Sequence, residues 1–397
     1  MDSICYILNS FPRPSETFIS DELSSMLDLG IKPYVLIFNE GEMKILHPSA
    51  RKIIDSDLVR KIKPTSKQKA LIAVLCLFML FPRNTLFILS KALRANDRWL
   101  YFQAVPYALS LIKKNVQFIH SHFADHNFKW AKTLSEWSGI PFGVTTHGYD
   151  LRNDPIPVNE ASQLFADADL VVTISAYNKA LMIDKYGIHS DKIRIIHCGI
   201  YTDRFNPDQS LEKFNDSKLN IINIGRLVPQ KGQDILLRAL AEAKERGVQF
   251  ELKIIGAGPL LDDLTELADS LEISSQVYFL NAQNQDVVIE MLKKADMLVL
   301  SSRSEGLPVV CMEAMAMEVL LIASRITGIP ELVSDRENGL LVEPEDVQGL
   351  ADTICWADQN RDALQEMTKS ARKKVEKDFN RIECTKSLIH EIKKSIK

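Results

Sequence analysis

Two pairs of charged residues in the second half of the chain have the types and spacing needed to bind a phosphorylated sugar. Glu305 and Glu313 have seven residues between them, in the run Ser-Glu-Gly-Leu-Pro-Val-Val-Cys-Met-Glu. Carboxylate oxygens accept hydrogen bonds from sugar hydroxyls. Arg226 and Lys231 lie five positions apart between two glycines, and a guanidinium fork with an ammonium charge suits phosphate oxygens. Together these residues predict a site for a nucleotide-sugar.

The elements that must position these groups are strands followed by helices. Residues 295–300 are short, apolar and β-prone, which predicts a buried parallel strand. Residues 308–317 predict a helix with a proline in its first turn. Glu305 is therefore expected at the carboxyl end of a strand and Glu313 within the first turns of the helix. Ligands bind at this edge of open parallel sheets, where helix N-termini attract anions.

The first half of the chain shows the same alternation. Strands are predicted at residues 4–8, 33–38, 116–120, 141–146 and 170–175, with helical stretches between them. This alternation favours a parallel, doubly wound sheet. His147 follows the strand 141–146 in the run Thr-His-Gly-Tyr-Asp, which makes it the strongest candidate site residue of this half.

These motifs resemble those of the family-4 retaining glycosyltransferases with the GT-B fold. The resemblance implies an α/β protein with two Rossmann-like doubly wound domains that face each other across a cleft. It assigns the donor sugar to Glu305, the ribose to Glu313 and the diphosphate to Arg226 and Lys231, and it sets His147 against the donor sugar. The structural alternatives are exposed acids beside a Gly-Pro turn, solvated surface cations and a core histidine.

Glycines and turn residues near these groups complete the expected donor site. The run Gly256-Ala-Gly258-Pro259 is not a dinucleotide fingerprint, because residue 261 is leucine where the third glycine would stand. It is similar to the family's G-x-G-P-L turn beside the nucleotide. The resemblance therefore adds backbone contacts with the donor at the following residues: Gly225, Gly256, Gly306, Leu307 and Pro308.

The turn after the first predicted strand departs from the family pattern. Most members have a glycine pair there, whereas this chain has Phe-Pro-Arg-Pro-Ser-Glu-Thr-Phe-Ile at residues 11–19 and no glycine. The run resembles a subgroup that builds bacterial exopolysaccharide, of the colanic-acid type. Ser15 and Thr17 are expected to cap the helix at 17–29 and to present hydroxyls and amides to the donor. Helix capping without a substrate role is the alternative.

Histidines follow the third predicted strand, at positions 120, 122 and 126. No cysteine or glutamate nearby in the sequence completes a tetrahedral set, so no metal site is predicted. The resemblance places His122 and Asp150 on the acceptor side. Structural histidines are the alternative.

Length and composition favour a soluble two-domain enzyme. The chain has 397 residues, a net charge of −4 and 46% hydrophobic residues, which gives no global attraction to nucleic acid. The predicted domains are an acceptor-side domain (1–206), a linker (207–218), a nucleotide-sugar domain (219–378) and a final helix that packs back on the first domain (379–397). Scattered cysteines and a first segment unlike a signal peptide predict a cytoplasmic protein.

Residues 51–98 are both basic and apolar. Eleven Lys or Arg stand against three acids, so this segment carries +8 and the remainder −12. Apolar runs at 70–81 and 86–89 lie among the cations. This pattern predicts peripheral docking on an anionic membrane, on the inner face of the cytoplasmic membrane. Ordinary core packing with a solvated basic face is the alternative.

The predicted activity is retaining, metal-independent transfer of a hexose from a UDP- or GDP-linked sugar. The acceptor is a glycan, expected to be polyprenyl- or lipid-linked, in exopolysaccharide or lipopolysaccharide synthesis. Two alternatives remain open: an epimerase or a transferase with a small soluble acceptor, and a non-catalytic sugar-nucleotide binder. The joint presence of both charged pairs and His147 argues against the binder.

Overall fold

The computed structural model describes residues 2–43, 46–95, 97–208 and 213–396, and the chain divides into two compact units. The first unit comprises residues 1–196 together with 383–397, and the second comprises residues 197–382. The predicted domain boundary at 206 thus lies inside the second unit. The predicted linker, 207–218, includes residues 209–212, which are outside the described residues, and it stays a prediction.

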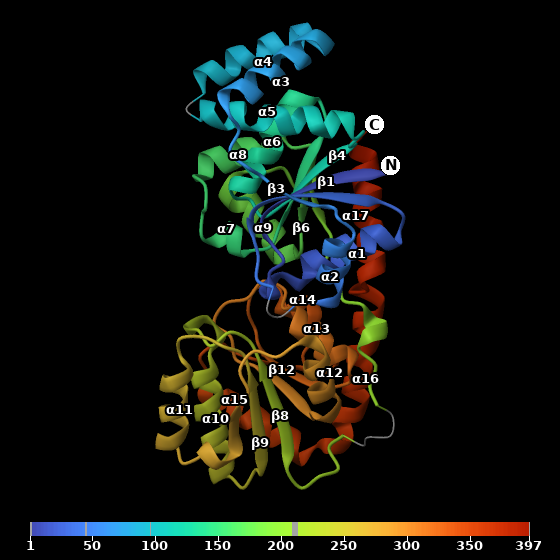
Figure 1. Ribbon diagram of the computed structural model, residues 1–397. Coiled ribbons are helices and arrows are strands. Elements are labelled where there is room, and N and C mark those ends of the chain that lie inside the picture. The colour runs from blue at the N-terminus through green and yellow to red at the C-terminus, as the bar shows by residue number, and fades with distance from the viewer. Residues whose placement is uncertain (1, 44–45, 96, 209–212, 397) are drawn as a thin grey trace. The chain divides into compact units, whose positions relative to one another are not determined.

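The first unit is built on a parallel sheet of seven strands in the order β3-β2-β1-β4-β5-β6-β7 (Figure 1). The order reverses at β1, whose neighbours are β2 and β4. Such a reversal opens a crevice at the carboxyl ends of the central strands. The strands are β1 (Ser3–Phe11), β2 (Lys32–Glu40), β3 (Val59–Lys61), β4 (Phe118–His122), β5 (Phe142–Thr146), β6 (Leu170–Thr173) and β7 (Ile193–Ile195).

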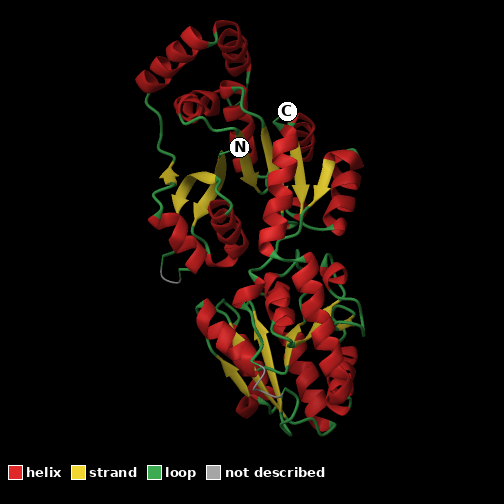
Figure 2. Cartoon of the chain, turned by 90° about the vertical axis from the view of Figure 1, so that its right-hand side faces the viewer, coloured by secondary structure: helices red, strands yellow, loops and turns green. Residues whose placement is uncertain are grey.

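Helices cover both faces of this sheet (Figure 2). The helices of the first unit are α1 (Thr17–Asp28), α2 (Pro48–Asp55), α3 (Lys67–Leu80), α4 (Pro82–Arg94), α5 (Arg98–Lys113), α6 (His126–Ser138), α7 (Tyr149–Arg152), α8 (Val158–Asp167), α9 (Ala176–Tyr186) and α17 (Arg381–Ser395), of which α3 and α4 lie outside the layers that cover the sheet. From the far end of the chain, α17 contributes Leu388, Ile389 and Ile392 to the apolar cluster that contains Ile4 and Tyr6 of β1. Burial of these side chains joins the end of the chain to the first unit.

The second unit has a parallel sheet of six strands in the order β10-β9-β8-β11-β12-β13. The strands are β8 (Leu219–Ile224), β9 (Phe250–Ile255), β10 (Val277–Phe279), β11 (Met297–Leu300), β12 (Leu320–Ser324) and β13 (Leu340–Val342). The helices are α10 (Gln233–Glu245), α11 (Leu261–Ser270), α12 (Gln285–Lys294), α13 (Val309–Ala316), α14 (Ile329–Leu332), α15 (Val347–Gln359) and α16 (Arg361–Asp378). The predicted α/β class with two doubly wound parallel sheets is confirmed.

The central strands are buried along their whole length, as expected for parallel strands covered on both faces. All four residues of β11 are buried, and so are all five of β4. The sequence of β4 is Phe-Ile-His-Ser-His, so it brings polar side chains into the interior. These buried polar groups need internal hydrogen-bond partners. Among the described residues, no helix has both the length and the apolar character required to cross a bilayer.

Candidate functional site

In the second unit, the loops after β8 and β11 bring Lys231 and Glu305 together. The Lys231 Nζ atom donates to Glu305 Oε1 at 2.6 Å, and Ser302 Oγ donates to the same oxygen at 2.6 Å. The Glu305 side chain is 8% exposed and that of Lys231 19%. An ion pair this sheltered is screened less by salt than a surface pair. The two predicted motifs therefore form one charged group at the carboxyl edge of the sheet.

Arg303, which the sequence analysis did not select, fastens these two loops to each other. Its guanidinium makes a two-pronged contact with Asp234, with both N–O distances 2.8 Å, and donates to the carbonyl oxygen of Pro229 at 2.8 Å. Its backbone N–H donates to the carbonyl oxygen of Gln230 at 2.8 Å. Hydrogen bonding to Asp234 raises the pKa of Arg303 and lowers that of Asp234. The only feature of the sequence that could have indicated a role for Arg303 was its position as a cation in the polar stretch after a strand.

Close backbone packing explains two glycines of the motifs. Gly232 has a φ of +61°, and a Cβ there would lie 2.0 Å from the carbonyl oxygen of Ser301. A Cβ on Gly256 would lie 1.8 Å from the carbonyl oxygen of Gly225. Any side chain at these positions would push neighbouring loops apart. The three loops that carry the predicted donor residues thus touch through backbone atoms.

The remaining predicted donor residues lie on the same loops or on the helix that follows one of them. Arg226 is exposed, and within the described part of the chain its guanidinium has no hydrogen bond or ion pair. Its carbonyl oxygen accepts from Gln233 Nε2 at 3.1 Å. Glu313 is half-buried in α13, whose N-cap is Pro308.

The turn before α13 is held from two sides. Leu307 is 5% exposed, and the carbonyl oxygen of Gly306 accepts from Thr327 Oγ1 at 3.3 Å. Burial, with the Glu305 charge nearby, raises the pKa of Cys311 in the first turn of α13. This thiol is consequently a packing group rather than a nucleophile.

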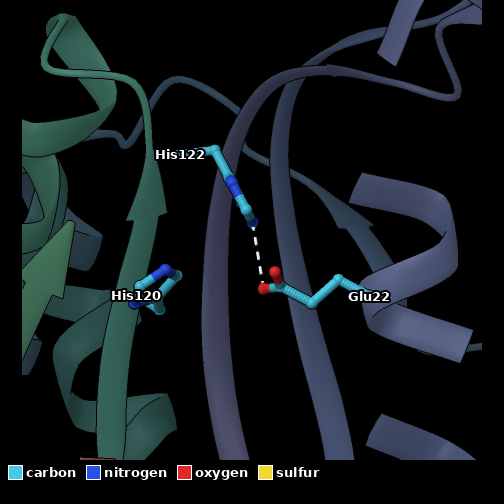
Figure 3. A group of neighbouring side chains, drawn as sticks. All are labelled: Glu22, His120 and His122. Atoms are coloured by element: carbon cyan, nitrogen blue, oxygen red, sulfur yellow. Dashed lines mark hydrogen bonds and ion pairs between the residues drawn. The ribbon is translucent and has the colours of Figure 1, made fainter. Parts of the chain in front are cut away.

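In the first unit, buried polar side chains form a chain of hydrogen bonds that includes His147. His122 Nδ1 lies 2.9 Å from His147 Nε2, and His122 Nε2 lies 3.2 Å from Glu22 Oε1. Tyr6 donates its hydroxyl hydrogen to the same Glu22 oxygen at 2.9 Å. Figure 3 shows Glu22 on α1 pointing at His122 at the end of β4, with His120 on the same strand.

His147 is held through its ring and through its backbone. Its ring contacts the rings of Phe18 and Phe123, at centroid distances of 4.5 and 4.8 Å. Asp150 accepts from the backbone N–H of His147 at 2.9 Å and from that of Ala124 at 2.8 Å. Burial raises the pKa of Asp150, and these amide donors oppose the rise. Asp150, which was predicted to face the acceptor, therefore positions the loop that carries His147.

The predicted capping by Ser15 and Thr17 is wrong. Glu16 is the N-cap of α1, and no side-chain cap hydrogen bond forms there. Residues Pro14–Glu16 make a short 3-10 turn before the helix, so Thr17 is already its first residue and Ser15 is exposed. The proline fixes the backbone ahead of the helix, which displaces the cap by one residue.

A glutamate that is distant in the sequence lies beside the strand-end histidines. Glu22, His120 and His122 each bring a potential ligand atom within 4.8 Å of the others. Their polar atoms already make internal hydrogen bonds: His120 Nε2 with Thr145 Oγ1 at 2.9 Å, and Glu22 with His122. Burial lowers the pKa of His120 to about 3, so it is neutral. His126 accepts from Trp130 Nε1 at 3.0 Å and is structural.

Comparison with known proteins shows the family. Residues 204–374 match the family model Glycosyl transferases group 1, and residues 73–204 match Glycosyltransferase Family 4. The glycosyltransferase WcaL of Escherichia coli strain K12, named for colanic acid biosynthesis, is 30% identical over 392 residues, covering 94% of this chain and 95% of WcaL. The amylovoran biosynthesis glycosyltransferase AmsK of Erwinia amylovora is 26% identical, covering 95% and 96% of the two chains.

Solved structures agree on the fold. The crystal structure of Anabaena Alr3699/HepE in complex with UDP superposes with a TM-score of 0.77 at 16% identity, covering 99% of this chain and 100% of that one. A glycosyltransferase from Rickettsia africae gives a TM-score of 0.77 at 20% identity, covering 100% and 99%. The chain therefore belongs to the family-4 glycosyltransferases with the GT-B fold, and it is a hexosyltransferase.

Proposed function

We propose that this enzyme transfers a hexose from a nucleotide-diphosphate sugar to a glycan acceptor in exopolysaccharide synthesis, with retention of anomeric configuration and without a metal ion. The observation that carries the proposal is the Lys231–Glu305 pair at the carboxyl edge of the second sheet, beside the exposed Arg226. It joins a group for phosphate to a group for sugar hydroxyls. The names of the relatives support the pathway, and the UDP and UDP-glucose complexes of Alr3699/HepE support the donor class.

The donor residues divide the ligand among them. Arg226 and Lys231 bind the diphosphate, Glu305 the sugar and Glu313 the ribose. The turn glycines Gly225, Gly256 and Gly306 let backbone approach the nucleotide, with Leu307 and Pro308 shaping the turn. Fixed cations then neutralise the leaving diphosphate, the task that a metal ion performs in other transferases.

The chemical step follows from these placements. The bond from the anomeric carbon to the phosphate oxygen breaks, and the acceptor oxygen bonds to that carbon on the same face. The acceptor proton passes to an oxygen of the leaving phosphate. The protein supplies position and electrostatic stabilisation, so no separate base is required. His147 and the neighbouring His122 belong to the sugar-binding machinery of the first unit.

The helices α3 and α4 form the proposed membrane contact. Of the described residues, seventeen large hydrophobic ones are exposed, and eleven of these lie between 71 and 99, including Met79 and Phe87, which are 75% and 70% exposed. Figures 1 and 2 show these helices at the margin of the first unit, outside the layers that flank the sheet. An apolar patch on this scale marks an interaction surface rather than ordinary core.

The charges on residues 51–98 indicate what kind of surface this segment would bind. All eleven cations between 51 and 98 are exposed. Lys52, Arg60, Lys61 and Lys91 pair with acids. The other seven have no ion pair with any described residue: Arg51, Lys63, Lys67, Lys69, Arg83, Arg94 and Arg98. Unpaired cations beside exposed apolar side chains suit an anionic bilayer surface, where a polyprenyl- or lipid-linked acceptor would lie.

The test uses the purified full chain with UDP- and GDP-sugars, first alone and then with lipid-linked oligosaccharide acceptors, in excess EDTA. Transfer that needs the acceptor, persists in EDTA and gives a product with the donor's anomeric configuration by NMR is expected. Donor epimerisation without an acceptor would establish the epimerase, and donor binding without turnover the non-catalytic binder. Loss of transfer in EDTA would overturn metal independence, and an inverted product would overturn retention.

A further inference from the structure

Two side-chain groups near His147 are buried without a hydrogen-bond partner. Among the described residues, the buried atoms Arg152 Nη1 and Asn178 Nδ2 make no hydrogen bond. Arg152 is half-buried at the end of α7, and Asn178 is 1% exposed in the first turn of α9. Buried polar groups are nearly always hydrogen-bonded, so two unsatisfied donors in one place indicate a partner from outside the chain.

Both groups converge on Gly148, the residue after His147. A Cβ on Gly148 would lie 3.0 Å from Arg152 Nη1, and 3.1 and 3.3 Å from Oδ1 and Nδ2 of Asn178. Gly148 follows β5 and Asn178 follows β6, and these two strands are parallel neighbours in the sheet. The two groups therefore lie together at the carboxyl edge of the first sheet, the edge at which open parallel sheets bind ligands.

Arg152 also lacks a counter-charge. Its guanidinium has no ion pair with any residue that the structure describes. The acids nearest to it in the sequence are engaged elsewhere: Asp150 accepts from backbone N–H groups, and Asp154 pairs with Lys185 at 2.6 Å. A cation withdrawn from water is normally paired, because burying an unpaired charge is costly. The missing partner is therefore an anion rather than water or a neutral hydroxyl.

We propose that Arg152 and Asn178 form a binding site for an oxyanion of the substrate, supplied either by a carboxylate on the acceptor glycan or by a phosphate of its lipid carrier. A guanidinium presents a fixed fork of donors to carboxylate and phosphate oxygens alike, and the amide adds a neutral donor beside it. Since Gly148 follows His147 directly, the anion would bind next to the sugar-binding histidine. That the anion belongs to the substrate rests on the proposed function, whereas the anion site itself does not.

The first experiment asks whether Arg152 is a structural residue. Arg152→Met keeps an apolar stem and removes the unpaired charge, so urea unfolding should find this variant at least as stable as wild type. Arg361→Met is the contrast, because the half-buried Arg361 guanidinium donates to the carbonyl oxygen of Phe214 at 3.1 Å and to Asp358 at 3.2 Å. This second variant should unfold at a lower urea concentration. An Arg152→Met midpoint that falls below wild type in the same way would overturn the proposal.

The second experiment measures anion binding by NMR of the full chain with 15N-labelled arginine. The Arg152 Nε–H signal is assigned by its loss in Arg152→Met, and the probes are glucuronate, inorganic phosphate and, as the neutral control, glucose. One of the two anions should shift this signal to saturation, and glucose should not. The more tightly bound anion identifies carboxylate or phosphate as the source.

Asn178→Asp sharpens this titration, because it supplies the missing counter-charge within the chain. A carboxylate at this position should pair with Arg152 and abolish the response to both anions. Arg238→Met, which removes an exposed cation from α10, is the control and should respond like wild type. A signal that neither anion shifts, or that chloride shifts equally, would refute the anion site.

The third experiment measures transfer to two lipid-linked acceptors that differ in one carboxylate, which is reduced to an alcohol in the second. A glycan carboxylate at the site should give the acidic acceptor a KM about ten- to a hundredfold lower, as expected for a hydrogen bond to a charged group. Arg152→Met should then lose this preference. A lipid phosphate at the site should instead make Arg152→Met raise KM for both acceptors alike.

The outcomes of the transfer assay separate this proposal from the proposed function. Wild-type KM for both acceptors in Arg152→Met would refute the role of the site in substrate binding. Absence of transfer by the wild type would refute the proposed function alone, since the anion titration stands without it.

Discussion

Lys231 Nζ lies 2.6 Å from Glu305 Oε1, although the two residues are 74 positions apart in the sequence. Each residue thus partly neutralises the charge of the other before any ligand binds. A diphosphate that reaches Lys231 must share the cation with Glu305, and a sugar hydroxyl that reaches Glu305 meets an oxygen already holding two donors. The two glutamates and the two cations should therefore respond differently to mutation.

Arg226→Ala and Lys231→Ala should each lower kcat/KM by about a hundred- to a thousandfold, comparable to the loss of one preorganised donor to a developing negative charge. Isothermal calorimetry should also show weaker binding of free nucleoside diphosphate. Arg238→Ala, which removes an exposed cation from α10, is the matched control and should behave as wild type. Undiminished nucleotide affinity in the Arg226→Ala, Lys231→Ala double variant would contradict the diphosphate assignment.

Substitutions of the two glutamates should have different effects when turnover and nucleotide binding are both measured. Glu305→Ala should reduce turnover but spare binding of the nucleotide alone, because its proposed partner is the sugar. Glu313→Ala should weaken nucleotide binding by about 1.5–3 kcal/mol, the contribution typical of a hydrogen bond to a charged group. The opposite pattern in calorimetry would show that the two roles are exchanged.

Gly232→Ala should destabilise the protein by at least about 1 kcal/mol more than Gly247→Ala, since overpacking typically costs 1–3 kcal/mol. Both glycines flank α10 and have positive φ, +61° and +95°, but only Gly232 has a carbonyl oxygen where the Cβ would stand. Urea unfolding of the two variants under identical conditions measures the difference. Equal midpoints would mean that the loop of Ser301 moves aside without loss.

The free energy of unfolding should fall as pH rises from about 4 to 7, because the protonated Asp125 stabilises the folded state and loses its proton over this range. Burial raises the pKa of this carboxyl to about 7, so the folded state holds the proton more tightly than the unfolded state does. Its stabilising contribution is complete below the unfolded pKa and is lost as pH passes through the folded one. Asp125→Asn keeps an oxygen to cap α6 and removes the titration. The unfolding free energy of the variant minus that of wild type should rise across this window and level off above it. A flat difference would contradict the raised pKa.

Liposome co-sedimentation should show binding that requires anionic lipid and falls with salt. Replacing four unpaired cations, Lys63, Lys67, Lys69 and Arg83, by Gln should weaken it by up to about 1 kcal/mol per charge. Met79→Ser with Phe87→Ser should weaken it as well. The charge-matched control replaces four cations of the second unit, Arg238, Lys244, Lys294 and Lys369, and should bind like wild type. Equal binding to neutral vesicles, or none at low salt, would refute membrane docking. A dimer that dissociates in the Met79, Phe87 variant would instead identify a second copy of the chain as the partner.

Local sequence patterns were sufficient for the fold class and for the second-unit motifs. Apolar runs such as β11 mark buried parallel strands whatever their neighbours, and a Gly-bounded turn after such a run has few conformations. Arg226, Lys231 and Glu305 could accordingly be placed on strand-end loops of one sheet, and Glu313 in the helix that follows one of these loops. Strand order, in contrast, is set by which long-range pairings bury the most surface, and no local pattern records it.

The tertiary structure alone decided which of these groups meet. Glu22 is 100 positions from His122 and became its partner only through packing of α1 on the sheet that contains β4. In the sequence Arg303 is an ordinary loop cation, and only the folded chain places Asp234 within hydrogen-bond distance of it. A short 3-10 turn likewise moved the cap of α1 from the predicted serine or threonine to Glu16. Hydrogen bonds between side chains depend on distances of a few ångströms between distant segments, and spacing along the chain carries no information on these distances.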